Sequence, residues 1–466
     1  MLKLYNTLSN TEEEFHPLED GVVRFYTCGP TVYNYAHIGN FRTFAFQDML
    51  RKYLKYSGYR VIHVMNITDV DDKTIQNARE QGMTLKDYTA KYTDAFFKDC
   101  EMLRIHPPDI APRATDHIQE MVALIRSLEE KGFTYRKDGS IYFSIASFPE
   151  YGKLSKADFS GAQAGSRVDT DKYDKANARD FVLWKAPKEG EDFWETEIGP
   201  GRPGWHIECS AMSMKYLGET FDIHVGGIDL VFPHHENEIA QSECATGKPF
   251  VRWWVHPEFL IVEGDKMSKS RGNFFTLRDL IDEGHSPETI RYLLLSVHYR
   301  KQLNFTTDGL RQAQASIQRL EDFARRAREK INEDAPAADF AEEVENALRR
   351  FREAMDNDIN TSAALAAVFD FVHFAWRKDS LNEFNGGDAR AALDFLKEID
   401  GVFNILQMRQ EIPDEEIAAE IEARQDARKR RDFAEADRIR KRLIEKGIQL
   451  EDTRDGIRWK RIPLHA

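Results

Sequence analysis

The segment VVRFYTCGPTVYNYAHIGN, residues 22–40, decides the fold that we expect. Its first part, Val22–Cys28, is a short run of β-branched and aromatic residues, which is typical of a buried strand. Gly29-Pro30 ends the strand, and a helical pattern then continues to Gly58. Tyr59–Ile67 predicts a second strand. Because a strand–helix–strand unit has parallel strands and a right-handed crossover, we predict an α/β fold with a Rossmann-type nucleotide-binding domain.

The loop between the first strand and the helix is a candidate phosphate site. It lies at the carboxyl edge of the sheet, where the free N–H groups and the dipole of a helix N-terminus favour anions. The loop is neither a dinucleotide fingerprint nor a P-loop, because it reads His37-Ile38-Gly39-Asn40. Gly39 permits close approach to the backbone, and His37 offers a hydrogen-bond donor. Taken alone, the loop is more typical of a satisfied histidine with an N-capping Asn40.

A second motif changes that interpretation. Lys266-Met267-Ser268-Lys269-Ser270 stands about 230 residues further on, and by itself it is typical of a solvated basic loop. Together the two motifs resemble the HIGH and KMSKS signatures of class I aminoacyl-tRNA synthetases. The second signature is matched at every position. The first departs only at Asn40, and that form resembles the cysteinyl-tRNA synthetases.

Composition limits the class of protein. The chain has 466 residues, of which 41% are hydrophobic and 31% charged, so we expect two to four domains. No 18-residue apolar run exists, and the N-terminus is polar and acidic, so we expect a cytoplasmic protein without a membrane segment. The four cysteines are too scattered for a disulfide scaffold, which leaves metal binding or plain burial.

Charge is distributed unevenly along the chain. The net charge is −14, but residues 424–461 contain 14 Lys/Arg and 8 Asp/Glu, a local charge of +6. A basic tail on an acidic body favours a localised nucleic-acid contact, although a solvated pair of charged helices is an equal alternative.

The pattern of elements predicts three domains. Residues 1–305 form the catalytic domain, with an insertion at about 115–200 and the KMSKS region at 250–300. Residues 306–408 predict a helical bundle, and 409–466 a small mixed α/β domain with two charged helices and a hairpin. Within this plan we expect a hairpin around Asp138-Gly139, mostly loops over Gly152–Pro203, one strand over Trp253–Val262, and one helix over 276–298. Asp69 is a candidate N-cap for the helix that follows it.

Cysteines and acidic or imidazole side chains gather at the predicted sheet edge. Cys28, Cys209 and the segment His234-His235-Glu236-Asn237-Glu238 all follow neighbouring strands. His234 and Glu238 share a helix face, but His235 with Glu238 is also possible, and buried cysteines with a capping histidine are a plain alternative. The motifs GWHIECS (204–210) and GGIDLVFPHHENE (226–238) resemble cysteinyl-tRNA synthetases. That resemblance implies one Zn²⁺ held by Cys28, Cys209, His234 and Glu238.

Such a metal would explain how the substrate is selected. Cysteine and serine differ by one atom, so a pocket that relies on shape separates them by only about 1–3 kcal/mol. Zinc prefers a thiolate strongly, and the chain has no room for a large editing domain. We interpret Cys100 and Cys244 as structural.

The resemblance implies two chemical steps: cysteine attacks ATP to give cysteinyl-adenylate, and the terminal ribose of tRNA(Cys) then takes the cysteinyl group. Orientation and charge stabilisation supply the catalysis. We expect His37 and Asn40 to hold the phosphates, and Lys266 and Lys269 to neutralise pyrophosphate, with Mg²⁺ accompanying ATP. The remaining expected ATP contacts are Thr31, Gly39, Gly227 and Asp229, and the expected cysteine contacts are Gly29, Thr68, Trp205 and His224.

Two alternative functions remain at this point. A ligase of the same fold that joins cysteine to an amino sugar would share both signatures and the zinc motif, but it would lack the basic tail. A zinc-stabilised nucleic-acid-binding protein would not need His37, Lys266 and Lys269. The tail, residues 431–461, resembles the anticodon-binding end of the synthetases. We therefore expect tRNA(Cys), ATP and L-cysteine as partners of a monomeric enzyme.

Overall fold

A computed structural model describes most of the chain. The described residues are 1–157, 167–168, 180–267, 272–331, 338–406, 414–430, 432–445, 448–453 and 456–461. Contacts divide the chain into two compact units, Met1–Leu406 and Gln407–Ala466. Within the described residues, no helix combines the length and the apolarity that crossing a bilayer requires.

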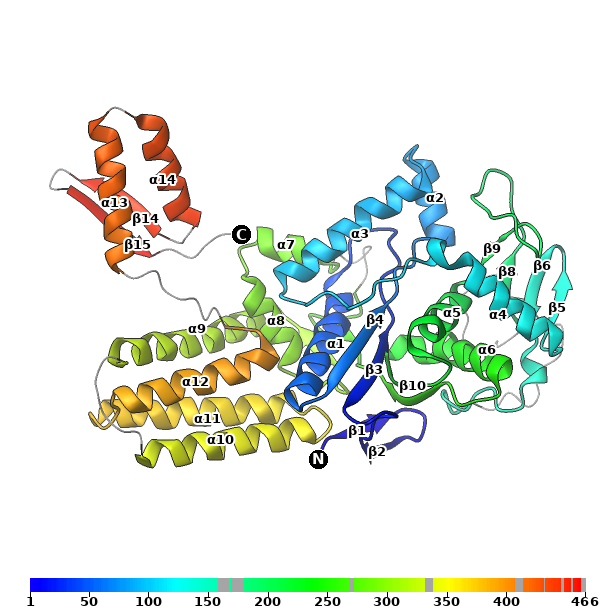
Figure 1. Ribbon diagram of the computed structural model, residues 1–466, viewed down its shortest axis with the longest axis horizontal. Helices are drawn as coiled ribbons and strands as arrows, with labels where there is room; N and C mark the ends of the chain where they lie inside the picture. Colours follow the sequence, from blue (N-terminus) through cyan, green and yellow to red (C-terminus); the bar gives the residue numbers. More distant parts are fainter. Residues whose placement is uncertain are drawn as a thin grey trace. The chain divides into compact units, whose positions relative to one another are not determined.

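The first unit contains a four-stranded parallel sheet in the order β11-β10-β3-β4 (Figure 1). Its strands are β3 (Val22–Thr27), β4 (Arg60–Met65), β10 (Phe221–Val225) and β11 (Val251–Val255). Helix α1 (Ile38–Tyr56) packs against β4, and α5 (Trp205–Leu217) packs against β3 and β4. This arrangement confirms the predicted α/β class with a Rossmann-type sheet.

The order of the strands creates a crevice at one edge of the sheet. The chain runs from β3 through α1 to β4 on one side of β3, whereas β10 pairs with the other side of β3. Doubly wound sheets bind ligands where the direction of winding reverses, outside the carboxyl ends of the strands. Cys28 directly follows β3 at this point, and Gly226 directly follows β10.

The start of α1 differs from the sequence interpretation, which made Asn40 the N-cap. His37 is the cap, and Asn40 occupies the third helical position. The His37 ring accepts a hydrogen bond from the Asn40 N–H, and the Asn40 side chain accepts one from the His37 N–H. This reciprocal pair is a capping box, in which each residue satisfies a backbone N–H of the other.

A second, mainly antiparallel sheet follows four helical segments. These segments are α2 (Asp72–Glu80), α3 (Leu85–Met102), η1 (Ala114–His117) and α4 (Ile118–Glu130). Strands β5 (Thr134–Lys137) and β6 (Ser140–Phe143) form the predicted hairpin. Asp138 and Gly139 both have positive φ, 52° and 81°, which suits a tight two-residue hairpin turn.

The expectation of loops over Gly152–Pro203 is wrong at β8 (Asp180–Lys185). All six residues of β8 are buried. The strand pairs with β6, β7 (Arg167–Val168) and β9 (Arg202–Pro203). Its apolar run, Phe181 to Trp184, shows no alternation because the strand is covered on both faces, and so it lacked the period-2 signal of a half-exposed strand.

Two predicted elements are divided in the structure. The strand expected over Trp253–Val262 is interrupted after β11, and β12 (Leu260–Val262) pairs with β13 (Leu303–Phe305) in a separate sheet. Pro257 lies in the gap and has no N–H to continue a ladder.

The helix expected over 276–298 is likewise two helices, α7 (Leu277–Asp282) and α8 (Pro287–Leu295). Gly284 lies between them with a φ of 91°, and Pro287 stands in the first turn of α8.

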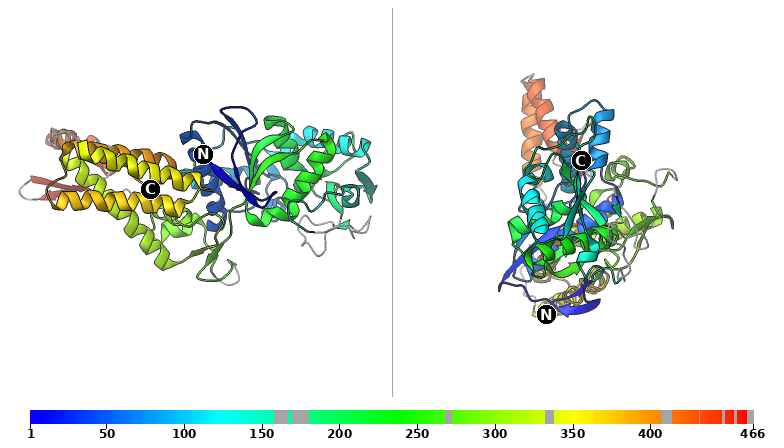
Figure 2. Two further views of the ribbon diagram at one scale, coloured as in Figure 1. Left: turned by 90° about the horizontal axis from the view of Figure 1, so that it is seen from below. Right: turned by 90° about the vertical axis from the view of Figure 1, so that its right-hand side faces the viewer.

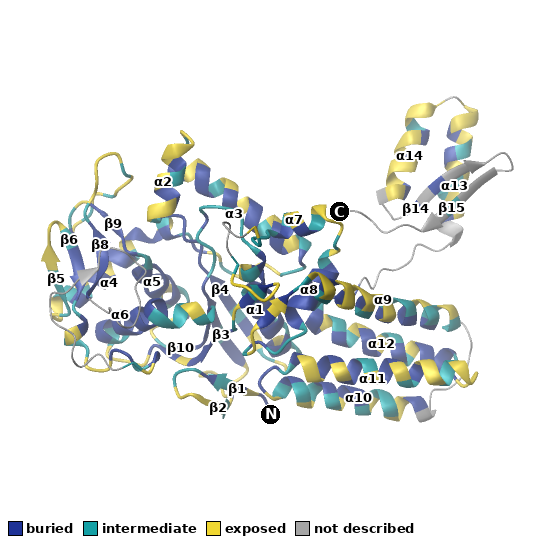
Figure 3. Ribbon diagram, turned by 180° about the vertical axis from the view of Figure 1, so that it is seen from behind, coloured by how far each residue is buried: buried dark blue, intermediate teal, exposed yellow. Residues whose placement is uncertain are grey.

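Four long helices complete the first unit. They are α9 (Thr307–Lys330), α10 (Ala338–Asp356), α11 (Thr361–Ser380) and α12 (Gly386–Phe403). In two views they lie side by side, on the opposite side of the parallel sheet from the antiparallel sheet (Figures 1 and 2). Their buried residues gather on the inner faces and the exposed residues on the outer faces (Figure 3), so the bundle has its own core.

The second unit is a small α/β module. Its elements are α13 (Asp414–Lys429), α14 (Phe433–Glu445), β14 (Ile448–Thr453) and β15 (Gly456–Arg461). The two strands are antiparallel, so the predicted pair of charged helices and hairpin is confirmed. Its core is formed by Ile417, Ile439, Leu443, Ile448 and Leu450.

Candidate functional site

A buried cluster of metal-binding side chains lies at the crevice. Cys28 comes from the end of β3 and Cys209 from α5. His234 lies in the short helical segment η5 (Val231–His235), and Glu238 lies in the first turn of α6 (Glu236–Thr246). One ligand atom of each of these four residues lies within 4.8 Å of the others, and all four are buried. The fold therefore brings together the four residues that the sequence analysis named.

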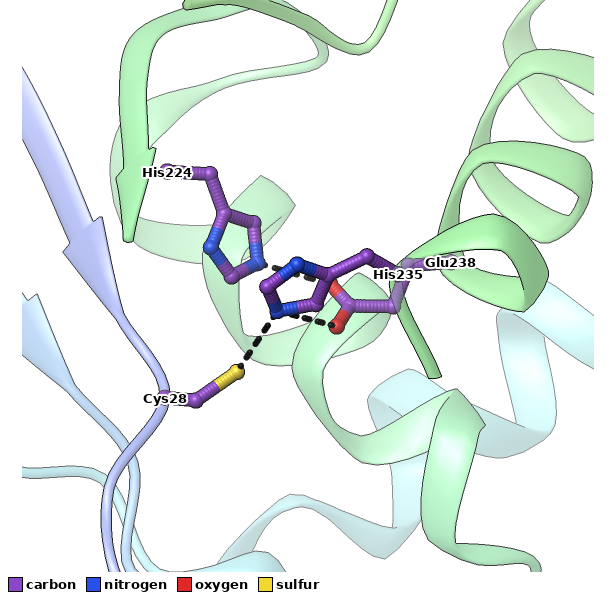
Figure 4. Close-up of side chains that lie close together, drawn as sticks. All are labelled: Cys28, His224, His235 and Glu238. Atoms are coloured by element: carbon purple, nitrogen blue, oxygen red, sulfur yellow. Dashed lines mark hydrogen bonds and ion pairs between the residues drawn. The ribbon is translucent and has the colours of Figure 1, made fainter. Parts of the chain in front are cut away.

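A second, overlapping group shares two members with the first. It consists of Cys28, His224, His235 and Glu238, again with ligand atoms within 4.8 Å (Figure 4). In this group His224 Nε2 lies 2.9 Å from Glu238 Oε2, and His235 Nε2 lies 3.3 Å from Cys28 Sγ. The arrangement therefore leaves two possible sets of four donors, which differ in whether Cys209 or a second histidine takes part.

Neighbouring histidines contact the rings of His234 and His235 at the nitrogen that faces away from the cluster. His234 Nδ1 lies 2.9 Å from His206 Nδ1, while its Nε2 lies 3.0 Å from Glu238 Oε1. His235 Nδ1 lies 2.7 Å from His256 Nε2. Such outer partners fix the orientation and the tautomer of metal-binding histidines. Each ring therefore directs Nε2 toward the centre of the cluster.

Electrostatics favour negative charge in the cluster. Burial raises the pKa of Glu238, but His224 and His234 outweigh it and lower the value to about 2. Burial raises the pKa of the Cys209 thiol, but hydrogen bonds with Cys28 and His234 bring it below its usual range. The His234 imidazole has its pKa lowered by burial and then raised by Glu238 and Cys209, to about 10. A cation that replaced the His234 proton would lie beside a carboxyl group and a thiol whose pKa values are both held below their usual range.

The two signature motifs meet at the start of α1. The Ile38 N–H donates to the Phe275 carbonyl over 2.9 Å, and His37 and Thr276 form an antiparallel bridge. The His37 ring also lies edge-on to Phe274, with centroids 5.4 Å apart. The segment directly after the KMSKS motif is therefore anchored to the HIGN segment, although about 230 residues separate the two in sequence.

Gly39 provides the close contact between these segments. A Cβ at this position would lie 3.0 Å from Met267 Cε and 3.0 Å from His37 Nδ1. Burial lowers the pKa of His37 to about 4, so the ring is neutral near pH 7. Lys266 is exposed, and Lys269 lies outside the described residues.

Further predicted nucleotide contacts lie at the same edge of the sheet. Thr31 forms a parallel bridge with Thr68, just beyond the ends of β3 and β4. Gly227 and Asp229 follow β10, and Asp229 is exposed. A Cβ on Gly227 would lie 2.4 Å from Asp229 Oδ1, so a larger residue there would displace the exposed Asp229 side chain.

The predicted cysteine contacts lie on both sides of the cluster. Trp205 stacks beside His234 with centroids 4.2 Å apart, and His224 binds Glu238 as described above. Gly29 directly follows Cys28 and approaches the next strand so closely that a Cβ would lie 1.7 Å from the Asn66 carbonyl oxygen. Thr68 is buried and donates to Glu208 Oε2 over 2.8 Å.

Sequence reasoning missed Glu208 in this region and misplaced Asp69. Asn66 and Glu208 form hydrogen bonds with Thr68, and both are buried. The sequence contained one signal for Glu208: it is a carboxylate inside the motif GWHIECS, where its neighbours are apolar or metal-binding residues. Asp69 does not cap α2, because Asp71 does so. Asp69 instead accepts hydrogen bonds from the backbone and the hydroxyl of Thr115.

Comparisons with known proteins agree with this geometry. The family described as tRNA synthetases class I (C) catalytic domain matches residues 14–315, and the DALR domain family matches residues 350–407. A cysteine–tRNA ligase of Solibacter usitatus is 58% identical over 463 residues, covering 99% of this chain and 99% of its own. A cysteine–tRNA ligase of Koribacter versatilis is 52% identical over 492 residues with the same coverage.

Solved structures support the fold independently. A Mycobacterium tuberculosis methionyl-tRNA synthetase in complex with methionyl-adenylate covers 82% of this chain and 89% of its own, with a TM-score of 0.61 and 17% identity. That likeness supports the class I catalytic fold and its helical extension. The match to the catalytic-domain family and the full-length relatives show that the chain belongs to the cysteine–tRNA ligase family of class I tRNA synthetases.

Proposed function

We propose that this chain attaches L-cysteine to tRNA(Cys) at the expense of ATP. The observation that carries the proposal is the agreement of full-length relatives with a site in which the HIGN segment, the KMSKS region and a thiol-containing cluster share one sheet edge. The reaction has two steps, formation of cysteinyl-adenylate with release of pyrophosphate, and transfer of the cysteinyl group to the 3′-terminal adenosine.

The cluster is proposed to hold one Zn²⁺ through Cys28, Cys209, His234 and Glu238. Two thiols, an imidazole and a carboxylate are donors that zinc accepts, and the site is buried, as structural and catalytic zinc sites are. His224 and His206 then serve as outer partners of Glu238 and His234. When bound, the ion supplies a preference for a thiolate over a hydroxyl, which would separate cysteine from serine.

The start of α1 is proposed to hold the phosphates of ATP, which enters with Mg²⁺. Phosphoryl transfer requires mainly positioning and compensation of charge. His37, Asn40 and the backbone at Gly39 present donors at the helix N-terminus, and Thr31, Gly227 and Asp229 line the same edge. Lys266 and Lys269 would bring positive charge to the departing pyrophosphate.

The cysteine pocket is proposed to lie between β3, β4 and α5, with contacts from Gly29, Thr68, Trp205 and His224. Support comes from the position of these residues around the cluster, next to the two thiols. The C-terminal unit, with its basic residues, is proposed to bind the anticodon end of tRNA.

The test is ATP-dependent attachment of labelled cysteine to total tRNA, with serine as the control amino acid. We expect charging by cysteine only, and cysteine-dependent exchange of pyrophosphate into ATP without tRNA. Exchange without charging would contradict the tRNA step and would favour a tRNA-independent cysteine ligase. Absence of both activities in zinc-loaded protein would overturn the proposal.

A further inference from the structure

A short chain of hydrogen bonds links Gly29 and Glu208, which are the sequence neighbours of the two cysteines of the cluster. The Gly29 N–H donates to Asn66 Oδ1 over 2.9 Å, and Asn66 Nδ2 lies 3.1 Å from Thr68 Oγ1. Thr68 Oγ1 lies 2.8 Å from Glu208 Oε2. Gly29 follows Cys28 in sequence and Glu208 precedes Cys209, so the chain begins and ends beside the two thiols.

The direction of every hydrogen bond in this chain is fixed. A backbone N–H can only donate, so the Asn66 side chain must turn its oxygen toward Gly29 and its NH₂ group toward Thr68. The Thr68 oxygen therefore accepts from Asn66, and its single proton goes to Glu208. The hydrogen bonds thus all point from Gly29 toward Glu208, and the last acceptor is the carboxyl group of Glu208.

The open position at Thr68 is an acceptor. A threonine hydroxyl has one proton and two lone pairs. The proton and one lone pair of Thr68 are used, which leaves one lone pair. Among the described residues, Glu208 Oε1 has no hydrogen-bond partner, although Glu208 is 0% exposed. A ligand that satisfies Thr68 must bring a donor, and the ammonium group of an amino acid has only donors.

We propose that Glu208 is a positioning residue that orients the Thr68 hydroxyl to accept a hydrogen bond from the α-ammonium group of the substrate. This inference rests on the proposed function, because it takes cysteine as the substrate. With the thiol at the cluster and the ammonium at Thr68, the amino acid is held at two points on either side of its α-carbon. Without Glu208 the Thr68 proton is free to turn toward the substrate, where it meets a donor.

The experiment compares three thiols in the zinc-loaded full-length enzyme. Cysteine is the substrate in pyrophosphate exchange, cysteamine is an inhibitor that lacks the carboxylate, and 3-mercaptopropionate is an inhibitor that lacks the amine. For Glu208→Met we expect the KM for cysteine and the inhibition constant of cysteamine to rise about 10–100-fold, as for loss of a hydrogen bond to a charged group. The inhibition constant of 3-mercaptopropionate and the zinc content should stay unchanged.

Two further variants test whether Glu208 acts through Thr68. Thr68→Val should give the same pattern. The double variant should show the same rise in KM and inhibition constant as the more impaired single variant, because both substitutions remove the same interaction. Glu208→Gln retains a carbonyl acceptor for the Thr68 proton. It should therefore keep most of the preference for thiols that carry an amine. If Glu208→Met does not fold, Thr68→Val and Glu208→Gln still decide the question.

Asp180→Leu is the matched control, because it removes another buried carboxylate that accepts from a hydroxyl, that of Tyr135 at 3.0 Å, in the antiparallel sheet. This variant should lower the stability of the fold without changing the KM for cysteine relative to the inhibition constants of the other two thiols. Equal weakening of all three thiols in Glu208→Met, or no change in any of them, would overturn the inference. A wild-type enzyme that does not activate cysteine would instead refute the proposed function.

Discussion

Cys209 is the residue that distinguishes the two overlapping donor sets. The set proposed here includes Cys209 and His234, whereas the other uses His224 and His235 with the same Cys28 and Glu238. Both sets are buried, and His234 and His235 each have a histidine partner at Nδ1, whereas His224 Nδ1 has no hydrogen-bond partner among the described residues. The second thiol favours the first set, because thiolates are the stronger zinc ligands and hydrogen bonds with Cys28 and His234 hold the pKa of Cys209 below its usual range.

At this scale we expect Cys209→Ser to lose zinc. A serine hydroxyl does not ionise near neutral pH, so the zinc content should fall from about one per chain to a small fraction. Metal analysis after dialysis measures the change, and Cys244→Ser is the control, because Cys244 is also buried but lies outside both sets. Full zinc content in Cys209→Ser, together with zinc loss in His235→Gln, would instead establish the second set.

At the scale of elements, the N-terminus of α1 has a structural role in addition to the phosphate binding that we propose for it. The capping box ties His37 and Asn40 together, and the bridge to Thr276 adds the segment that follows KMSKS. The conformation of the helix N-terminus is therefore fixed by contacts within the chain.

Asn40→Ala should weaken this arrangement in two ways. Losing a capping interaction costs about 1 kcal/mol, so the free energy of unfolding should fall by that amount in urea denaturation. We also expect the KM for ATP to rise, because the His37 N–H loses its acceptor and the loop becomes less ordered. Thr84→Ala removes the cap of α3 and serves as the control. It should cost similar stability, and an equal rise of its KM for ATP would contradict a specific role for Asn40.

Ion pairs connect α2 to strands β8 and β9. Asp72 pairs with Lys185 at 2.9 Å and also with Arg202. Burial raises the pKa of Asp72, but these two cations outweigh it and lower the value to about 2. The carboxylate therefore stabilises the folded chain above its unfolded pKa of about 3.9, and this contribution disappears as the pH falls toward 2.

We accordingly expect Asp72→Asn to lower the free energy of unfolding at pH 7 by about 1 kcal/mol, a value reduced for the half-exposed carboxylate. At pH 3 about half of this difference should remain, since the unfolded carboxyl is then mostly protonated. Urea denaturation of the wild type and of Asp72→Asn at pH 7 and pH 3 measures this difference in the free energy of unfolding. An equal difference at pH 7 and pH 3 would show that charge is not responsible.

At the scale of the whole molecule, a buried arginine joins the catalytic sheet region to the helical bundle. Arg291 on α8 pairs with Asp48 on α1 at 2.6 Å and donates to the carbonyl of Phe403 at the end of α12, also at 2.6 Å. Arg291 and Asp48 are almost completely buried. The position of α1 therefore depends on the bundle as well as on the sheet.

Arg291→Met should destabilise the first unit by about 3–5 kcal/mol, because it leaves a buried carboxylate without its main partner. Urea denaturation measures the loss. The double variant Asp48→Leu/Arg291→Met should recover part of the stability, since it removes both charges together. A double variant as unstable as the single one would show that packing, rather than the unpaired charge, determines the loss.

Substitutions in the C-terminal unit should affect the binding of tRNA and leave the activation of cysteine unchanged. Arg440 and Lys441 are exposed on α14. We expect Arg440→Glu/Lys441→Glu to raise the KM for tRNA at least about 10-fold, because several phosphate contacts are lost or reversed. Pyrophosphate exchange should be unaffected, and Arg311→Glu/Arg325→Glu on α9 provides a charge-matched control at exposed positions. Equal effects on charging in both double variants would indicate a general loss of electrostatic attraction.

The sequence by itself determined the parallel sheet, the paired signatures, the hairpin turns and the chemical types of the cluster, because these depend on local periodicity and on motifs of a few residues. The tertiary structure decided the rest. It placed Phe275 against Ile38 and Glu208 against Thr68, contacts between residues more than 100 positions apart that no local pattern specifies. It also revealed β8, whose burial on both faces removes the alternation that marks a strand. Long-range packing determines which side chains meet, and therefore which of the candidate residues form a site.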